Sequence, residues 1–291
     1  MIYHWILAAR PKTLLAALSP VAIGATLALR DGKFQVWPML TALLCAVSVQ
    51  IGTNFCNDYC DFFQGADTDQ RKGPKRAVQA GLISPRWMLV ATVLMFSITA
   101  LASGFLAFHA GWPFLVLGGL SILLGVLYTA GRYSLAYLGI ADPFVLIFFG
   151  PVAVAGTYYV QALELNWSSI VAGFGPGLIA TGLLVVNNLR DVDEDRAANK
   201  RTLVVRFGVN FSRIQYAVCI IGAALVPVVF VLGESHWWPL LASLVVAPGL
   251  LLVLRVWLSE GHELGHCLGM TALLLLMYTM LFCVGLGMGL L

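Results

Sequence analysis

The sequence from residue 167 to residue 195 reads WSSIVAGFGPGLIATGLLVVNNLRDVDED. No charged side chain occurs in it before Arg190, and four acidic side chains then follow between residues 191 and 195. An apolar run of about 20 residues is long enough to cross the hydrocarbon core of a bilayer as a helix. The stretch therefore predicts a membrane-spanning helix over residues 167–187, with an acidic segment at its end.

Comparable apolar runs occur along the whole chain, and we expect each of them to form a spanning helix. The expected spans are 13–30, 37–56, 87–108, 112–130, 142–161, 167–187, 212–232, 237–258 and 269–290. Residues 2–12 are expected to lie at the membrane interface before the first span. The sequence therefore predicts one all-α domain over residues 1–291, an integral membrane bundle of about nine transmembrane helices.

The composition supports a protein built for lipid. Hydrophobic residues make up 60% of the chain and charged residues 11%, with a mean hydropathy of +0.88. Soluble domains carry roughly 25% charged residues, so the expected surroundings are the lipid bilayer. The net charge of +3 is modest, and the basic residues do not form a soluble basic domain, which argues against a nucleic-acid partner.

The basic residues indicate how the chain is oriented, because cytoplasmic loops carry an excess of Lys and Arg. If the N-terminus is cytoplasmic, 15 of the 17 basic residues fall on the cytoplasmic side, and only Arg30 and Lys33 fall outside. The sequence therefore predicts a multi-pass protein of a bacterial-type cytoplasmic (inner) membrane. Its N-terminus is expected inside and its C-terminus outside.

Two longer polar segments, predicted as cytoplasmic loops over 57–86 and 188–211, follow the second and sixth expected spans. They contain eight of the 14 acidic residues of the chain. These acidic residues are Asp58, Asp61, Asp67, Asp69, Asp191, Asp193, Glu194 and Asp195. Such segments are often no more than solvated loops, but here asparagines also stand at the preceding helix ends, and polar groups at membrane depth are candidates for function.

The spacing of the acids points to a metal. If the helices continue, Asp58 and Asp61 share one face, as do Asp191 and Asp195. Like charges placed in this way repel each other unless a cation lies between them. Magnesium prefers carboxylate oxygens completed by substrate phosphates, and Arg or Lys side chains nearby suit diphosphate oxygens. The pattern therefore predicts a magnesium–diphosphate site that faces the cytoplasm.

The chain resembles the UbiA superfamily of intramembrane aromatic prenyltransferases at these motifs. The first motif reads Asn57-Asp58-Tyr59-Cys60-Asp61 with Asp67 following, and the second reads Asp191-Val192-Asp193-Glu194-Asp195. Longer strings, namely residues 73–84, 128–131, 187–191 and 199–208, resemble the 1,4-dihydroxy-2-naphthoate polyprenyltransferases within that superfamily. The resemblance extends from Arg10 to at least Gly208.

The resemblance implies a UbiA-like fold and a magnesium-dependent enzyme. Such an enzyme transfers a polyprenyl group from polyprenyl diphosphate to 1,4-dihydroxy-2-naphthoate with loss of carbon dioxide, giving demethylmenaquinone in menaquinone biosynthesis. The implied magnesium ligands are Asn57, Asp58, Asp61, Asp67, Asp191 and Asp195, of which Asp58, Asp61, Asp191 and Asp195 are the catalytic candidates. The implied substrate-binding residues are Lys12, Asn54, Arg71, Arg76, Tyr128, Asn188, Lys200 and Arg201.

Several alternatives stay open from the sequence. The acceptor could be another aromatic acid, such as 4-hydroxybenzoate. An ion-coupled transporter would place charges near the middle of its spans, whereas these acids stand at helix ends. Tyr158, Tyr159 and Asp142 are further candidates for the acceptor pocket, and either Arg132 or Arg190 could pair with the acceptor carboxylate.

Overall fold

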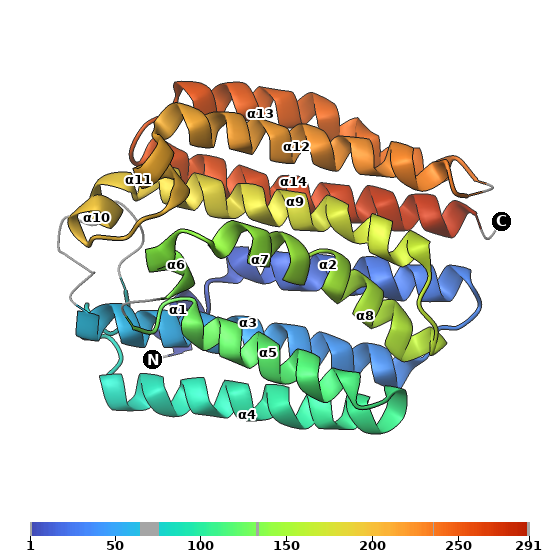
Figure 1. The fold of residues 1–291 in the computed structure, drawn as a ribbon, viewed down its shortest axis with the longest axis horizontal. Coiled ribbons are helices and arrows are strands. Elements are labelled where there is room, and N and C mark those ends of the chain that lie inside the picture. Colours follow the sequence, from blue (N-terminus) through green and yellow to red (C-terminus); the bar gives the residue numbers. More distant parts are fainter. Residues whose placement is uncertain (1, 65–75, 132–133, 235, 290–291) are drawn as a thin grey trace.

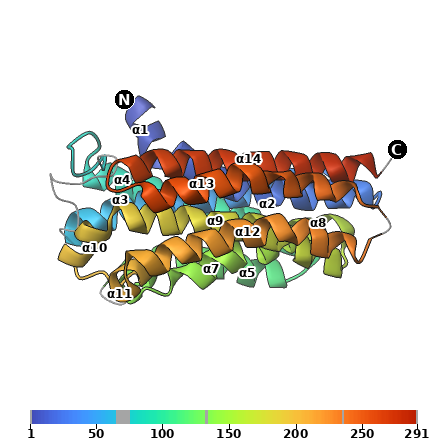
Figure 2. The same ribbon diagram turned by 90° about the horizontal axis from the view of Figure 1, so that it is seen from above.

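The computed structural model describes residues 2–64, 76–131, 134–234 and 236–289. In this part of the chain the helices lie side by side in a bundle (Figure 1), and a view from above shows that they are stacked in depth as well (Figure 2). The helices are α1 (Ile2–Ala9), α2 (Pro11–Arg30), α3 (Val36–Gln64), α4 (Pro85–Ala110), α5 (Pro113–Leu127), α6 (Leu135–Leu138), α7 (Ala141–Phe148), α8 (Pro151–Ala162), α9 (Trp167–Arg190), α10 (Val192–Ala197), α11 (Leu203–Phe207), α12 (Val209–Val231), η1 (Trp238–Val245), α13 (Val246–Leu258) and α14 (Glu263–Met288).

The helix lengths confirm an all-α membrane bundle. Among the described residues, eight segments are long and apolar enough to cross a membrane, with α7 and α8 counted together and η1 and α13 counted together. The shorter apolar helix α5 makes a ninth segment. The two chain ends lie at opposite ends of the bundle in Figure 1, as an odd number of crossings requires.

Proline sets several of the helix starts. Four helices begin at Pro11, Pro85, Pro113 and Pro151, a position where the missing N–H costs no helical hydrogen bond. The span expected over 142–161 is divided into α7 and α8. Gly150, just before Pro151, has a backbone conformation outside the helical region.

The first polar segment differs from its prediction. It was expected to be a loop from residue 57 onward, but α3 continues to Gln64 and carries the acidic motif on its last turns. The acidic side chains do not end the helix because their charges are taken up by partners from other elements, as described below.

The helix α9 lies at the centre of the bundle. It contacts α2, α7, α8, α12 and α14, and 78% of its apolar window is buried, against at most 50% in any other span. A helix that is apolar on all sides is suited to this position. Gly175 permits the closest approach, because a Cβ atom there would lie 1.9 Å from the Tyr278 hydroxyl oxygen of α14.

The outer surface is strongly apolar. Large side chains such as Phe108, Leu258 and Leu232 are 93%, 82% and 82% exposed, whereas soluble monomers rarely expose extended apolar patches. The chain is therefore a multi-pass membrane protein. The ends of α3 and α9 meet at one end of the bundle, on the left in Figure 1, together with α1, α6, α10 and α11.

Candidate active site

The first acidic cluster occupies one side of the last turns of α3. Asn54, Asn57, Asp58 and Asp61 are only 2% to 5% exposed, and their spacing of three and four residues keeps them on one face. Each makes a specific contact: Asn57, for example, accepts a hydrogen bond from the Thr129 hydroxyl. Buried polar groups of this kind are tolerated because they are paired.

Asp58 binds backbone. Its Oδ2 accepts a hydrogen bond from the Ala77 N–H at 3.0 Å, and its Oδ1 accepts one from the Val78 N–H at 3.1 Å. Both oxygens of this carboxylate are therefore engaged by the turn that precedes α4.

Asp61 lies between two cations. Arg76 places a guanidinium nitrogen 2.5 Å from its Oδ2, and the ammonium of Lys200 lies 3.6 Å from its Oδ1. The same ammonium is 3.9 Å from a carboxylate oxygen of Asp195. Lys200 therefore connects the first acidic cluster to the second, although the two are far apart in sequence.

The second cluster is built around a break between helices. Asp191 lies between α9 and α10, and its carboxylate is bound by the Arg190 guanidinium at 2.6 and 2.7 Å. That guanidinium also donates to the side chain of Asn187 at 2.9 Å. The Asp195 N–H bonds to the Asp191 carbonyl at 2.8 Å, so the short helix α10 holds the two carboxylates in a fixed relation.

Asp195 lies in the short helix α10 and is 8% exposed. Burial raises the pKa of Asp195 to about 7, against the opposing effect of Lys200, while Asp191 and Asp61 raise it further. A proton and a metal cation compete for such a carboxylate. The Thr202 hydroxyl donates a hydrogen bond of 3.5 Å to Oδ2 of Asp195, the carboxylate oxygen that does not face Lys200.

A cavity of about 350 Å³ runs from this end of the bundle into the apolar interior. Its polar end is lined by Arg10, Lys12, Asn54, Asn57, Tyr128 and Asn187. Its interior is mainly aliphatic, with Phe114, Phe144, Phe148 and Phe149. We call this space the apolar chamber. Its mainly apolar lining suits a hydrocarbon ligand.

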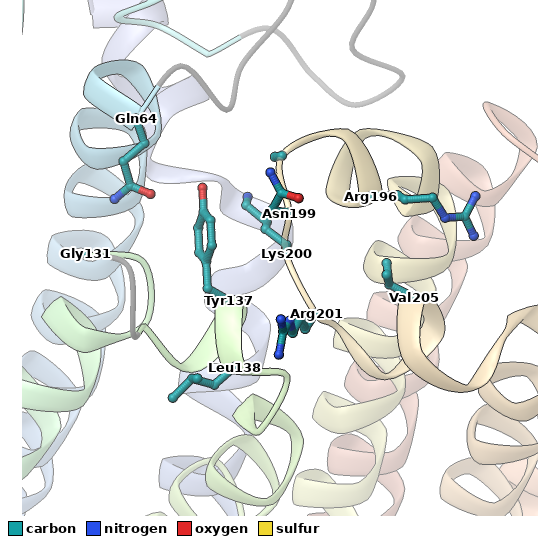
Figure 3. Close-up of a pocket in the computed structure, with 10 residues that line it drawn as sticks. Gln64, Gly131, Tyr137, Leu138, Arg196, Asn199, Lys200, Arg201 and Val205 are labelled. Carbon is teal, nitrogen blue, oxygen red and sulfur yellow. The ribbon is translucent and has the colours of Figure 1, made fainter.

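A second, more open cavity of about 850 Å³ lies beside the clusters. Figure 3 shows Gln64 from α3, Tyr137 from α6, and Lys200 and Arg201 from the loop between α10 and α11 around it. The Lys200 ammonium lies 5.5 Å from the centre of the Tyr137 ring. We call this space the basic vestibule. Its cations suit a phosphate-bearing substrate.

The structure brings most of the predicted site residues together. Asp67 and Arg71 lie outside the described residues, as does Arg132. Asn187, and not its neighbour Asn188, is part of the chamber lining, because adjacent helical residues point about 100° apart. Arg76 is buried in its ion pair with Asp61.

Other candidates are engaged by partners of their own. Tyr158 donates a hydrogen bond to Asp31 at the opposite end of the bundle, and Tyr159 packs against Phe114. The Asp142 carboxylate is bound by Gln215. The guanidinium of Arg190 is occupied by Asp191, which removes it as a ready partner for an acceptor carboxylate.

Sequence reasoning did not single out Arg10, Thr129 or Thr202 for the site. Each of them lies inside or beside a string that carries the family resemblance, and that position is the sequence signal that could have identified it. Arg10 adopts a left-handed conformation, with φ of 52°, which is costly for a residue with a side chain. Asn54 holds this junction by donating to the Ala9 carbonyl at 2.9 Å.

Comparisons with known proteins show the family. The UbiA prenyltransferase family matches residues 17–275. The chain is 38% identical to the 1,4-dihydroxy-2-naphthoate octaprenyltransferase of Escherichia coli, with 82% of this chain and 81% of the relative covered. It is 34% identical to the enzyme of the same name from Haemophilus influenzae, over 98% of this chain and 96% of the relative.

Solved structures share the fold. A UbiA homolog from Archaeoglobus fulgidus bound to GPP and Mg2+ aligns with a TM-score of 0.65 at 15% identity, covering 96% of this chain and 99% of the other. A UbiA homolog from Aeropyrum pernix aligns with a TM-score of 0.69 at 13% identity, covering 92% and 97%. With its apolar chamber and its two acidic clusters, this chain belongs to the UbiA prenyltransferase family.

Proposed function

We propose that this protein transfers a polyprenyl group from polyprenyl diphosphate to 1,4-dihydroxy-2-naphthoate with loss of carbon dioxide, a step of menaquinone biosynthesis. The structural observation that carries the proposal is that the polar end of the apolar chamber is lined by Asn54, Asn57 and Asn187, the asparagines that flank the two buried acidic clusters. The choice of acceptor is supported by the relatives at 34% to 38% identity, which are named for that acceptor.

Magnesium is the cofactor that we propose, and the donor set fits it. Among the described residues no group of three or more His, Cys, Asp or Glu side chains could hold a metal alone. Magnesium usually takes only one or two carboxylates and completes its shell with substrate phosphates and water. The buried Oδ1 of Asp61 has no hydrogen-bond donor among the described residues, so it is open to a ligand.

We assign the metal to both clusters. Asn57 and Asp61 would hold one magnesium ion, and Asp191 and Asp195 another. Asp67 remains a predicted ligand. When bound, magnesium would neutralise charge on the leaving diphosphate. We give Asp58 a different role, because the donors that hold its two oxygens are backbone N–H groups of the turn before α4, whereas the donor to Asp191 is the Arg190 side chain.

The residues of this chain supply the rest of the chemistry. Lys200, Arg201 and Arg76 would balance the negative charge of the diphosphate as the allylic C–O bond breaks. The apolar chamber keeps water away from the resulting carbocation at the prenyl C1. Aromatic faces such as those of Phe144 and Phe148 can stabilise that cation.

The acceptor ring then forms the new bond. The ring carbon that bears the carboxylate attacks the prenyl C1, and this carboxylate leaves as carbon dioxide, with its bonding electrons returned to the ring. The products are diphosphate, carbon dioxide and demethylmenaquinone in its dihydroxy form. The orientation that we propose puts the basic vestibule on the cytoplasmic side, where soluble diphosphate is released.

A labelled acceptor tests the proposal. Purified protein is incubated with polyprenyl diphosphate, magnesium and a panel of aromatic acids that includes carboxyl-labelled 1,4-dihydroxy-2-naphthoate. We expect labelled carbon dioxide to appear in step with prenylated product and only in the presence of magnesium. Product that keeps the label, or faster transfer to 4-hydroxybenzoate, would reject the proposed acceptor.

A further inference from the structure

The turn at residues 76–83 is bound by the side chain of Asp58. The Ala77 and Val78 N–H groups donate to the two carboxylate oxygens, as described above. The turn closes on itself through bonds from the Leu82 and Ala80 N–H groups to the carbonyls of Ala77 and Arg76. An acidic side chain that accepts the first free N–H groups of a turn stabilises it as a helix cap does.

Apolar contacts hold the same turn against α3 from the other side. Ala77, Val78 and Ile83 are buried in a cluster that also contains Phe55 of α3 and Met88 of α4. The turn is therefore fixed by packing and by the Asp58 carboxylate together.

The residue that begins this turn reaches the metal-binding carboxylates. Arg76 immediately precedes the anchored backbone, and its guanidinium contacts Asp61 at 2.5 Å. Three consecutive residues are therefore held by the two aspartates. Asp58 binds the backbone of Ala77 and Val78, and Asp61 binds the side chain of Arg76. Anchoring the turn fixes where the Arg76 guanidinium can reach.

We propose that Asp58 is a positioning residue that anchors the turn at residues 76–83 and so presents Arg76 to the diphosphate beside Asp61. This rests on the proposed function for the identity of the diphosphate, but the anchoring itself does not. If Asp58 turned away from the turn, two buried N–H groups would lose their acceptor, and each is costly to leave unpaired. Asparagine cannot replace Asp58 well. The side-chain NH2 group of asparagine would face the N–H group of Ala77 or Val78, and two donors cannot bond to each other.

The first test needs no activity. Amide hydrogen exchange of Ala77 and Val78 is followed in detergent-solubilised, metal-free protein. We expect Asp58→Asn to speed exchange at both amides at least tenfold, and Asp193→Asn, which removes an exposed carboxylate, to change it less than twofold. Unchanged exchange in Asp58→Asn would overturn the proposal, whether or not the chain proves to be a prenyltransferase.

The second test separates positioning from metal binding. We expect Asp58→Asn to raise the KM for polyprenyl diphosphate about tenfold while the magnesium concentration for half-maximal rate stays within twofold. We also expect it to have little further effect in an Arg76→Met background, because both changes act on the same guanidinium. A tenfold rise in the magnesium requirement would instead show that Asp58 is a metal ligand. Additive effects of the two substitutions would show that Asp58 does not act through Arg76, and either result would overturn the proposal.

Discussion

The two ends of the helical bundle both carry charged side chains, but each end pairs them differently. At the end opposite the active site, Arg30 bonds to Asp31 at 2.9 Å and to Glu234 at 3.0 Å. Lys33 pairs with Glu164 there, and Tyr158 donates to Asp31 at 2.7 Å. These contacts tie neighbouring loops together through ion pairs and one hydrogen bond.

At the active-site end, four carboxylates are buried among three cations. Asp58, Asp61, Asp191 and Asp195 are 2% to 8% exposed, and Arg76, Arg190 and Lys200 lie against three of them. Burying charge is costly even when it is paired, so this arrangement is a poor way to stabilise a fold. The comparison teaches that the deep burial of its carboxylates separates the functional end from the structural one.

The comparison also explains the two basic residues that depart from the positive-inside pattern. Arg30 and Lys33 were the only basic residues expected outside the cytoplasm. Both are neutralised by acids from distant segments, so they add little net charge to that end.

The difference between the two ends of the bundle would be contradicted most directly if both ends faced the same side of the membrane. We expect a reporter that is active only outside the cytoplasm to be active when fused after α14 and silent when inserted at Ala198. The expected difference is all-or-none, because the two positions lie at opposite ends of the bundle. Equal activity at both positions would reject the orientation.

The second expectation compares one carboxylate from each end. Asp61→Asn should lower the rate of prenyl transfer about 10²-fold or more, since it removes charge stabilisation at the reacting diphosphate. Asp31→Asn should leave the rate within about twofold and lower the thermal midpoint instead. Rates at saturating magnesium and unfolding in detergent are measured for both. A large rate loss in Asp31→Asn would show that the far end is not purely structural.

The third expectation compares two lysines. Lys200→Met should reduce kcat/KM for polyprenyl diphosphate roughly tenfold, because a charged hydrogen bond contributes about 1.5–3 kcal/mol. Lys33→Met removes a pair that is largely exposed, and such pairs contribute only about 0–1 kcal/mol. Initial rates and unfolding curves give both quantities. Equal effects of the two substitutions on kcat/KM would contradict a role for Lys200 in substrate binding.

The smallest expected effect is that of Tyr158→Phe. Loss of the hydroxyl removes one hydrogen bond to Asp31, which should lower the free energy of unfolding by about 1 kcal/mol. The rate of prenyl transfer should not change, since Tyr158 is not part of the chamber lining. An altered KM for the aromatic acceptor would contradict this expectation and would show that Tyr158 contributes to the acceptor pocket.

Most of the fold could be predicted because spanning helices leave a simple signal. The apolar run before Arg190 predicted α9 to within three residues, and the paired motifs predicted which helix ends would meet. The extension of α3 to Gln64 was not predicted, because an acidic stretch resembles a loop until the partners of its side chains are known.

The sequence indicated which residues would form the site, but not which of their side chains would bind one another. Nothing in the local sequence shows that Asp58 binds the backbone of residues about twenty positions later, while Asp61 faces Lys200. Those contacts depend on how the turn before α4 and the loop after α10 are folded. Likewise, the choice between Asn187 and Asn188 depends on the rotation of α9, which the apolar pattern does not define on a helix buried on all sides.

The central position of α9 has a consequence for how the protein is made. A chain is synthesised from its N-terminus, so α9 enters the membrane before α12 and α14, two of the helices that enclose it. Until α14 is inserted, the groove at Gly175 that receives Tyr278 faces lipid. The helix that bears the second acidic cluster is therefore fully enclosed only when the last span arrives. A chain whose synthesis ended before α14 would have both acidic motifs but an incomplete bundle around one of them.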